Sequence, residues 1–279
     1  MDRYIPVAAG AVFYSCLSAV LSFLIKPPEY LPQKEKRDFI GQHVSIVHSL
    51  NAILFSFAIY FYDGGLHYND VTTITQAIAL GHTVGYMVYD MLYSEIFSLF
   101  DWPMRIHHLA VLIGGNILMA ATYGGSPSLI CIIITEMSNP FNLSRSILKA
   151  RHMEETKIYK VVELAFALIF LVNRCLFGSL VIYNAWASNI GFLVKTTMSI
   201  VHGVGIFWSY VILSMISKKF RNNKGLAVKI LSTITMVIKR NRPAFVLFIM
   251  MFSFIMPYFM TSILKTGFVN IRYGNFIII

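Results

Sequence analysis

The residues of this chain that could do chemistry are polar side chains within otherwise apolar segments. They are His48, Asp90, His107, His108, Glu136, Asn139, Arg145, Arg174 and His202. Histidine titrates near neutral pH and can act as a general acid or base, while carboxylates and guanidinium groups can hold a charged head group. If the protein is an enzyme, His107 and His108 are the candidate catalytic residues.

A metal centre is not expected from the histidine pair. Adjacent residues on a helix point about 100° apart, so His107 and His108 cannot chelate one ion as an i,i+4 pair does. The three cysteines lie far apart in the sequence and provide no cluster of ligands. The sequence therefore predicts neither a bound metal nor a cofactor.

The elements that position these residues must be membrane-spanning helices. The chain has 279 residues, of which 57% are hydrophobic and only 13% charged, and its mean hydropathy is +0.66. Soluble chains carry about 25% charged residues, so a soluble globular domain is excluded. The net charge of +10 then indicates contact with an anionic membrane surface rather than with nucleic acid.

A membrane-crossing helix needs roughly 20 mostly apolar residues. That rule predicts an all-α bundle of about eight spans, at residues 6–25, 43–62, 71–93, 104–123, 127–148, 158–184, 192–217 and 244–264. Lys and Arg are concentrated in the odd-numbered connectors between the spans, and short basic loops stay on the cytoplasmic or matrix side. We therefore expect both termini on the outer or lumenal side of an endoplasmic reticulum or inner mitochondrial membrane.

The polar residues lie on six helices, and none falls in the outer third of a span. An unpaired charge at mid-bilayer costs at least about 2.5–3.5 kcal/mol, so we expect these groups to share one polar cavity open toward the inner leaflet. The alternative is a set of structural pairs, Asp90 with Arg105 and Glu136 with Arg174, which fix the helix register. Asn139–Pro140 predicts a break in the fifth span, and Gly81, Gly85, Gly203 and Gly205 predict close helix approaches.

The C-terminal part of the chain has a different character. Residues 218–243 combine an apolar stripe with basic residues and predict an amphipathic helix on an anionic inner leaflet. The basic residues are Lys218, Lys219, Arg221, Lys224, Lys229, Lys239, Arg240 and Arg242. We accordingly divide the chain into an N-terminal span and basic loop (1–39), a bundle (40–217), this basic segment, and a last span with its tail (244–279). Residues 218–279 are candidate docking elements for protein partners.

The order of motifs resembles the TLC-domain superfamily, which includes ceramide synthases and their non-synthase relatives. The resemblance rests on His43-Val-Ser-Ile-Val-His48, on Tyr89-Asp90 followed by Arg105-Ile-His107-His108-Leu-Ala, on the stretch from Thr135-Glu136 to Arg145, and on Asn173-Arg174. It covers residues of about 40–215 and is similar to the non-synthase branch in the stretch from Glu136 to Arg145. The resemblance implies a multi-pass helical fold associated with lipid.

The resemblance leaves three functions open. Our preferred hypothesis is a protein that binds lipid, a phospholipid or sphingolipid, in the bundle and affects or senses membrane lipid composition. The second is a non-catalytic accessory subunit of a larger membrane complex, for example of respiratory-chain type. The third is an acyl-CoA-dependent N-acyltransferase of ceramide-synthase type, against which stands Asn139, because the synthases carry an Asp-x-x-Asp pair where this chain has Glu136-x-x-Asn139.

Overall fold

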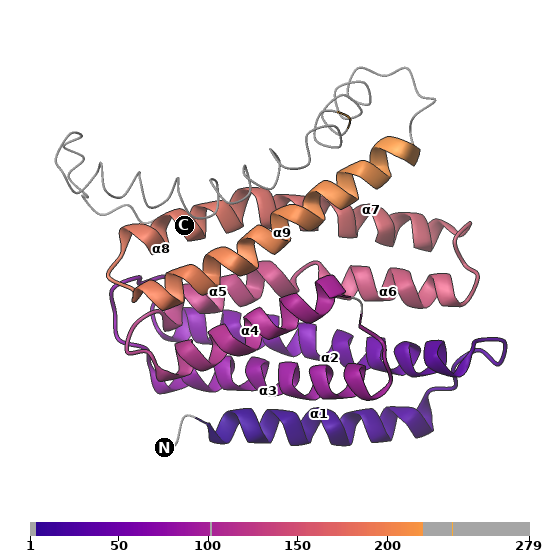
Figure 1. Cartoon of the computed structure of the whole chain (residues 1–279), viewed down its shortest axis with the longest axis horizontal. Helices are drawn as coiled ribbons and strands as arrows, with labels where there is room; N and C mark the ends of the chain where they lie inside the picture. The colour runs from indigo at the N-terminus through magenta and orange to yellow at the C-terminus, as the bar shows by residue number, and fades with distance from the viewer. Residues whose placement is uncertain (1–3, 101, 220–235, 237–279) are drawn as a thin grey trace.

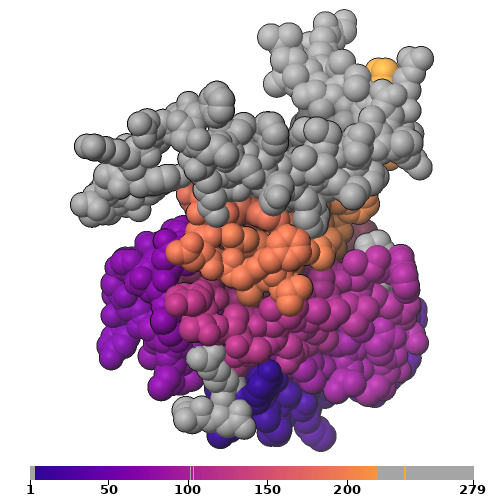
Figure 2. Space-filling view, turned by 60° about the vertical axis from the view of Figure 1, so that its left-hand side comes forward, coloured from indigo at the N-terminus to yellow at the C-terminus, as the bar shows by residue number. Residues whose placement is uncertain are grey.

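The computed structural model describes residues 4–100, 102–219 and 236, and within them the chain forms an all-helical bundle. The helices are α1 (Ile5–Leu24), α2 (Gln33–Tyr62), α3 (Ile74–Ile96), α4 (Trp102–Ala120), α5 (Gly125–Glu136), α6 (Asn139–Ala150), α7 (Lys157–Leu171), η1 (Val172–Phe177), α8 (Gly178–Ala187) and α9 (Phe192–Lys219). The predicted class, a multi-pass helical membrane bundle, is confirmed. Figure 1 shows α1 along one edge of the bundle, with α7, α8 and α9 on the opposite side, and Figure 2 likewise shows the N-terminal helix and α9 well apart.

Four helices of the described part are long and apolar enough to cross a membrane. They are α1, α2, the continuous rod Lys157–Ala187 formed by α7, η1 and α8, and α9 as far as Lys218; α4 is a shorter apolar helix. The predicted third span, α3, has twelve buried residues, so its composition is set by packing against protein as well as by lipid. The predicted span at 244–264 lies outside the described residues.

The basic connectors meet at one end of the bundle and the other connectors meet at the opposite end (Figure 1). At the basic end, the hydroxyl of Tyr30 donates to the carbonyl of Ala150, and the guanidinium of Arg37 lies over the ring of Phe97. At the other end, Ser126 donates to the carbonyl of Gly65. Loops that alternate in charge along the sequence are thus gathered into two ends of distinct charge.

Close helix contacts in this bundle depend on glycine, which has no side chain. A Cβ on Gly85 of α3 would overlap the carbonyl oxygen of Val7, and one on Gly10 of α1 would come within 3.0 Å of the carbonyl oxygen of His82. The predicted approach at Gly85 is therefore a contact with α1. Small residues permit this because the backbones can come together without displaced side chains.

Candidate functional site

A cavity of about 650 Å³ runs through the bundle between α2, α3, α4, α5, α6, α7, η1, α8 and α9. Along α9 its walls extend from Thr197 to Met215, which at 1.5 Å per residue is about 27 Å, close to the thickness of the hydrocarbon core. Its volume lies within the range of small-molecule sites, roughly 300–1,000 Å³. The space is long enough to take an extended ligand along the bundle.

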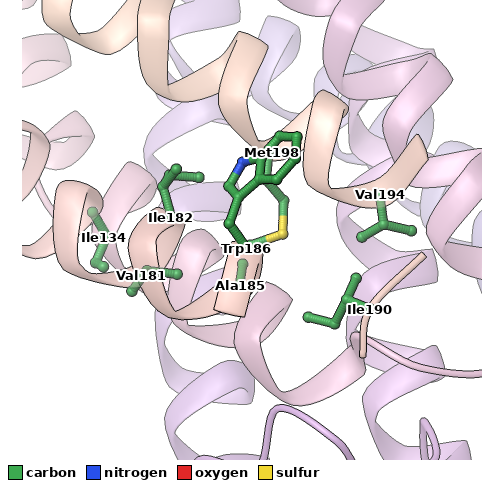
Figure 3. Close-up of a cluster of buried hydrophobic side chains, with 8 residues drawn as sticks. All are labelled: Ile134, Val181, Ile182, Ala185, Trp186, Ile190, Val194 and Met198. Carbon is green, nitrogen blue, oxygen red and sulfur yellow. The ribbon is translucent and has the colours of Figure 1, made fainter. Parts of the chain in front are cut away.

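One end of the cavity is apolar. Ile134, Ile182 and Met198 line it and belong to a buried cluster, shown in Figure 3, whose other members are Val181, Ala185, Trp186, Ile190 and Val194. The indole nitrogen of Trp186 donates to Ser199 Oγ at 2.9 Å, so this polar atom is satisfied within the cluster. The cluster closes this part of the cavity with hydrocarbon and suits an acyl chain.

The polar part of the cavity gathers eight of the nine residues singled out from the sequence. Those that line it are Asp90, His107, His108, Glu136, Asn139, Arg145, Arg174 and His202. They come from α3, α4, α5, α6, η1 and α9. Side chains separated by more than a hundred residues in the sequence therefore face one space.

His48 is the exception, because it lies outside the cavity lining. It is 1% exposed, its ring stacks on Tyr86 with centroids 3.6 Å apart, and its Nδ1 lies 3.3 Å from the hydroxyl of Tyr14. The same hydroxyl lies 2.8 Å from Nε2 of His82. The expectation that His48 faces the shared cavity is thus wrong, because α1 supplies Tyr14 as a separate partner that the sequence pattern did not reveal.

The two expected ion pairs do not form among the described residues. Asp90 Oδ2 lies 2.7 Å from Nε2 of His108, and Arg105 pairs instead with Glu95, Nε to Oε1 at 2.5 Å and Nη2 to Oε2 at 3.1 Å. Glu95 and Arg105 face each other across the loop between α3 and α4 at the rim of the bundle. Asp90, which lies inside the bundle, therefore faces the buried histidine His108, which is 6% exposed.

Both ring nitrogens of His108 are occupied. Nδ1 lies 3.0 Å from the carbonyl oxygen of Met104, and Nε2 faces Asp90. A carbonyl can only accept, so Nδ1 carries a proton, and the contact with Asp90 then holds a second proton between ring and carboxyl group. His108 is held in a fixed orientation by this arrangement and has no ring nitrogen left for a ligand.

His107 differs from its neighbour. Its ring lies edge-on to that of His108, with centroids 5.5 Å apart, and tilted against Trp208 at 5.1 Å. Its Nδ1 is buried and has no hydrogen-bond partner among the described residues. His107 is therefore the histidine of the pair with unused hydrogen-bonding capacity in the cavity.

Glu136 is satisfied from two other helices. Its Oε2 accepts from Ser49 Oγ of α2 at 2.8 Å and from Asn139 Nδ2 of α6 at 2.9 Å, and the residue is 5% exposed. It forms no ion pair with Arg174 within the described part of the chain. Ser49 was not predicted from the sequence, since a serine in an apolar helix carries no distinguishing signal.

The predicted break in the fifth span is present and has a matching irregularity in the next rod. α5 ends at Glu136, and α6 begins at Asn139 with Pro140, which has no N–H to donate. Opposite the break, α7 gives way to η1, one π-helical turn that contains Asn173 and Arg174. Such turns are rare and frequently occur at functional sites.

Asn173 and Arg174 complete the broken helix. Asn173 Nδ2 donates to the carbonyl of Ile134 at 3.3 Å, and Arg174 Nη2 donates to the carbonyl of Thr135 at 3.2 Å. The last carbonyls of a helix have no partner within it, so these side chains satisfy acceptors that lipid could not. The break and the π turn are thus two halves of one arrangement.

Glycine makes room for the buried cation. A Cβ on Gly205 of α9 would lie 2.9 Å from Cδ of Arg174, and a Cβ on Gly178 would lie 3.0 Å from Nδ1 of His202. The predicted close approach at Gly205 is therefore a contact with a side chain rather than with a backbone. Arg174 is only 5% exposed, and its Nε has no hydrogen-bond partner in the part of the chain that the structure describes.

An aromatic pair in the wall of the cavity was not anticipated from the sequence. Phe166 and Phe170 of α7 lie one turn apart, with ring centroids separated by 5.7 Å. The guanidinium carbon of Arg145 lies 5.1 Å from the centre of the first ring, and that of Arg174 lies 5.2 Å from the centre of the second. Phenylalanine is so common in this chain that neither ring stood out.

The residues predicted to contact the membrane surface are mostly beyond the described part of the chain. Lys218 is exposed at the end of α9, and Lys219 is the last residue of that helix. Arg221, Lys224, Lys229, Lys239, Arg240 and Arg242 lie outside the described residues. The amphipathic segment that they define stays a prediction.

Comparison with known proteins identifies the family. A family model described as the TLC domain matches residues 38–218, about two thirds of the chain. The chain belongs to the TLC-domain family. It is also similar to TLC domain-containing protein 4 A of Dictyostelium discoideum, at 25% identity over 149 residues, which cover 50% of this chain and 58% of that relative. No solved structure matches. The matched region contains every cavity-lining residue named above, whereas α1 precedes it.

Proposed function

We propose that this TLC-domain protein binds a membrane lipid inside the bundle and through it affects or senses membrane lipid composition. The observation that supports this is the single cavity with an apolar part and a polar part. A hydrocarbon chain would occupy the part lined by Ile134, Ile182 and Met198, and the head group would meet His107, Arg145 and Arg174.

The energetics favour a lipid over water as the occupant. Each methylene moved from water into an apolar site gains about 0.8 kcal/mol. A ligand already dissolved in the bilayer gains less, so its selection depends on the polar groups and on the fit of the chain. The buried polar groups of the cavity provide that selection, because hydrocarbon alone cannot satisfy them.

The proposal can be tested by filling the cavity with a larger side chain. Val201 lines the cavity, so Val201→Trp should reduce the amount of lipid that stays bound to the purified full chain in native mass spectrometry. Val161→Trp is a matched control, because Val161 is 65% exposed on α7 and does not line the cavity. Lipid retention that is equal in both variants, or absent from the wild type, would contradict lipid binding in the cavity.

A second candidate function is acyl transfer, favoured by His107. His107 lines the cavity, and its buried Nδ1 has no hydrogen-bond partner among the described residues. The imidazole could take a proton from an amine that attacks the carbonyl carbon of an acyl-CoA thioester and expels the CoA thiolate. If this reaction occurs, His107→Ala should abolish acyl-CoA turnover. His108→Ala should affect turnover only indirectly, by disturbing the position of neighbouring side chains, since both ring nitrogens of His108 are already hydrogen-bonded within the protein. Purified protein that turns over no acyl-CoA with any long-chain base would exclude it.

The accessory-subunit alternative depends on residues 218–279. Of these only 218, 219 and 236 belong to the described residues. Co-purification with large membrane partners would support this alternative, and migration as a small single particle in mild detergent would count against it.

A further inference from the structure

The acidic side chains of the cavity are already occupied by donors of the protein itself. Asp90 faces His108, Glu136 accepts from Ser49 and Asn139, and Asp38 accepts from Gln42 Nε2 at 2.6 Å. Each of these carboxyl groups therefore has a hydrogen-bond donor without any ligand. A ligand has little to gain by bringing further donors to this side of the cavity.

The two arginines of the cavity are in the opposite situation. Neither Arg145 nor Arg174 takes part in an ion pair within the described residues. Within residues 4–100 and 102–219, Arg174, which is 5% exposed, makes one hydrogen bond through Nη2, while its Nε has no partner. Arg145 has one long contact, 3.5 Å from Nη2 to Asn142 Oδ1. Guanidinium carries five N–H donors, so most of the donor capacity of both groups is unused.

The two guanidinium groups are held on one support. Each lies over one ring of the Phe166–Phe170 pair, and these rings are one helical turn apart. Stacking on aromatic faces leaves the edges of a guanidinium group free, and those edges are the donors that bind an anion in bidentate fashion. All four side chains line the cavity.

We propose that the ligand of the cavity carries an acidic head group, phosphate or carboxylate, and that Arg145 and Arg174 bind it against the Phe166–Phe170 pair. This inference rests on the proposed lipid binding and adds the chemical class of the lipid. The acidic wall, formed by Asp38, Asp90 and Glu136, stays internally hydrogen-bonded and excludes the anion from that side.

The test compares three lipids with the same oleoyl chain, bound to the purified full chain in detergent. They are oleoyl lysophosphatidic acid, oleic acid and the neutral monoolein. We expect at least one acidic lipid to bind at least tenfold more tightly than monoolein, since hydrogen bonds to charged groups are the strong ones. Equal affinity for the acidic and neutral lipids would overturn the inference.

Variants separate the arginines from general attraction to a basic protein. Arg145→Gln should remove most of the preference for the acidic lipids, and Arg174→Lys should reduce it, because Lys keeps the charge but loses the planar fork. Lys160→Gln removes one exposed positive charge outside the cavity and should leave the preference unchanged. A preference that survives in Arg145→Gln/Arg174→Gln would overturn the inference.

Two further measurements distinguish a wrong head-group assignment from binding of a free anion and from a failure of the proposed lipid binding. Inorganic phosphate at millimolar concentration should not displace the acidic lipid; full displacement would mean a site for the free anion and not for a lipid head group. If monoolein binds as tightly as the acidic lipids and Val201→Trp blocks all three, the cavity binds lipid but the head-group assignment is wrong. If none of the three binds, the proposed function fails as well.

Discussion

Replacement of Gly205 by alanine should destabilise the protein, although alanine is the better helix former. An added Cβ would lie 2.9 Å from Cδ of Arg174, whereas ordinary contacts begin at 3.4 Å, so the side chain must move by about 0.5 Å. A shift that carries the guanidinium by the same amount away from Thr135 would lengthen its 3.2 Å bond to the carbonyl of Thr135 to about 3.7 Å. That separation is no longer a hydrogen bond.

The magnitude follows from two opposing contributions. Loss of a hydrogen bond from a charged donor costs about 1.5–3 kcal/mol. Alanine recovers about 0.8–1.0 kcal/mol of helix propensity relative to glycine. The net free energy of unfolding should therefore fall by about 0.5–2 kcal/mol, and the melting temperature by about 1–8 °C at roughly 2–4 °C per kcal/mol.

The assay is thermal unfolding of the detergent-solubilised full chain, followed by circular dichroism. The matched background is Arg174→Ala, in which there is no side chain for the new Cβ to displace. There Gly205→Ala should leave the melting temperature unchanged or raise it, so the sign of the effect reverses between the two backgrounds. A melting temperature at or above wild type for Gly205→Ala alone, or an equal drop in both backgrounds, would refute the reasoning.

Two other substitutions probe contacts outside the cavity. Tyr14→Phe removes the hydroxyl that lies between His48 and His82 in the buried core, and it should lower the free energy of unfolding by about 1–3 kcal/mol in the same assay. The control is Tyr93→Phe, at a half-buried site near the basic end, which should lower it by less. An equal loss in the two variants would contradict a special role for Tyr14. Glu95→Gln breaks the ion pair between Glu95 and Arg105, whose two side chains are 40% and 35% exposed. It should lower the free energy of unfolding by less than about 1 kcal/mol, and by still less at high salt. A loss of several kcal/mol would show that this pair is shielded from solvent.

The sequence by itself determined the class of the molecule. Low charge content and long apolar runs require helices in a membrane, because only structures that satisfy their own backbone hydrogen bonds can span lipid. Pro140 marked the break in the fifth span, since a proline in a helix interior removes a backbone hydrogen bond and clashes with the preceding turn. The residues from Glu136 to Arg145 and the histidine pair carried enough local pattern to indicate the TLC-domain family, which the family model confirms.

The partners of the polar residues were decided only by the tertiary structure. Asp90, Arg105 and Glu136 each found a partner other than the one expected, because a pairing depends on helix rotation and on distances across the bundle. His48 lies outside the shared cavity and contacts Tyr14 of α1 instead, and no spacing in the sequence predicts that these two helices meet. The chemistry of a buried polar group is set by the neighbours that satisfy it, and those neighbours belong to other helices.

The π turn is the clearest example of a feature that could not be predicted from the sequence. Asn173 and Arg174 face the broken end of α5 because η1 widens one turn of the sixth span, and the cost of that irregularity is offset by the carbonyls it satisfies on another helix. Local propensity cannot predict a turn whose stabilising contacts lie some forty residues away. The polar residue types were thus visible in the sequence, whereas which of them keep free donors for a ligand depended on how the helices pack.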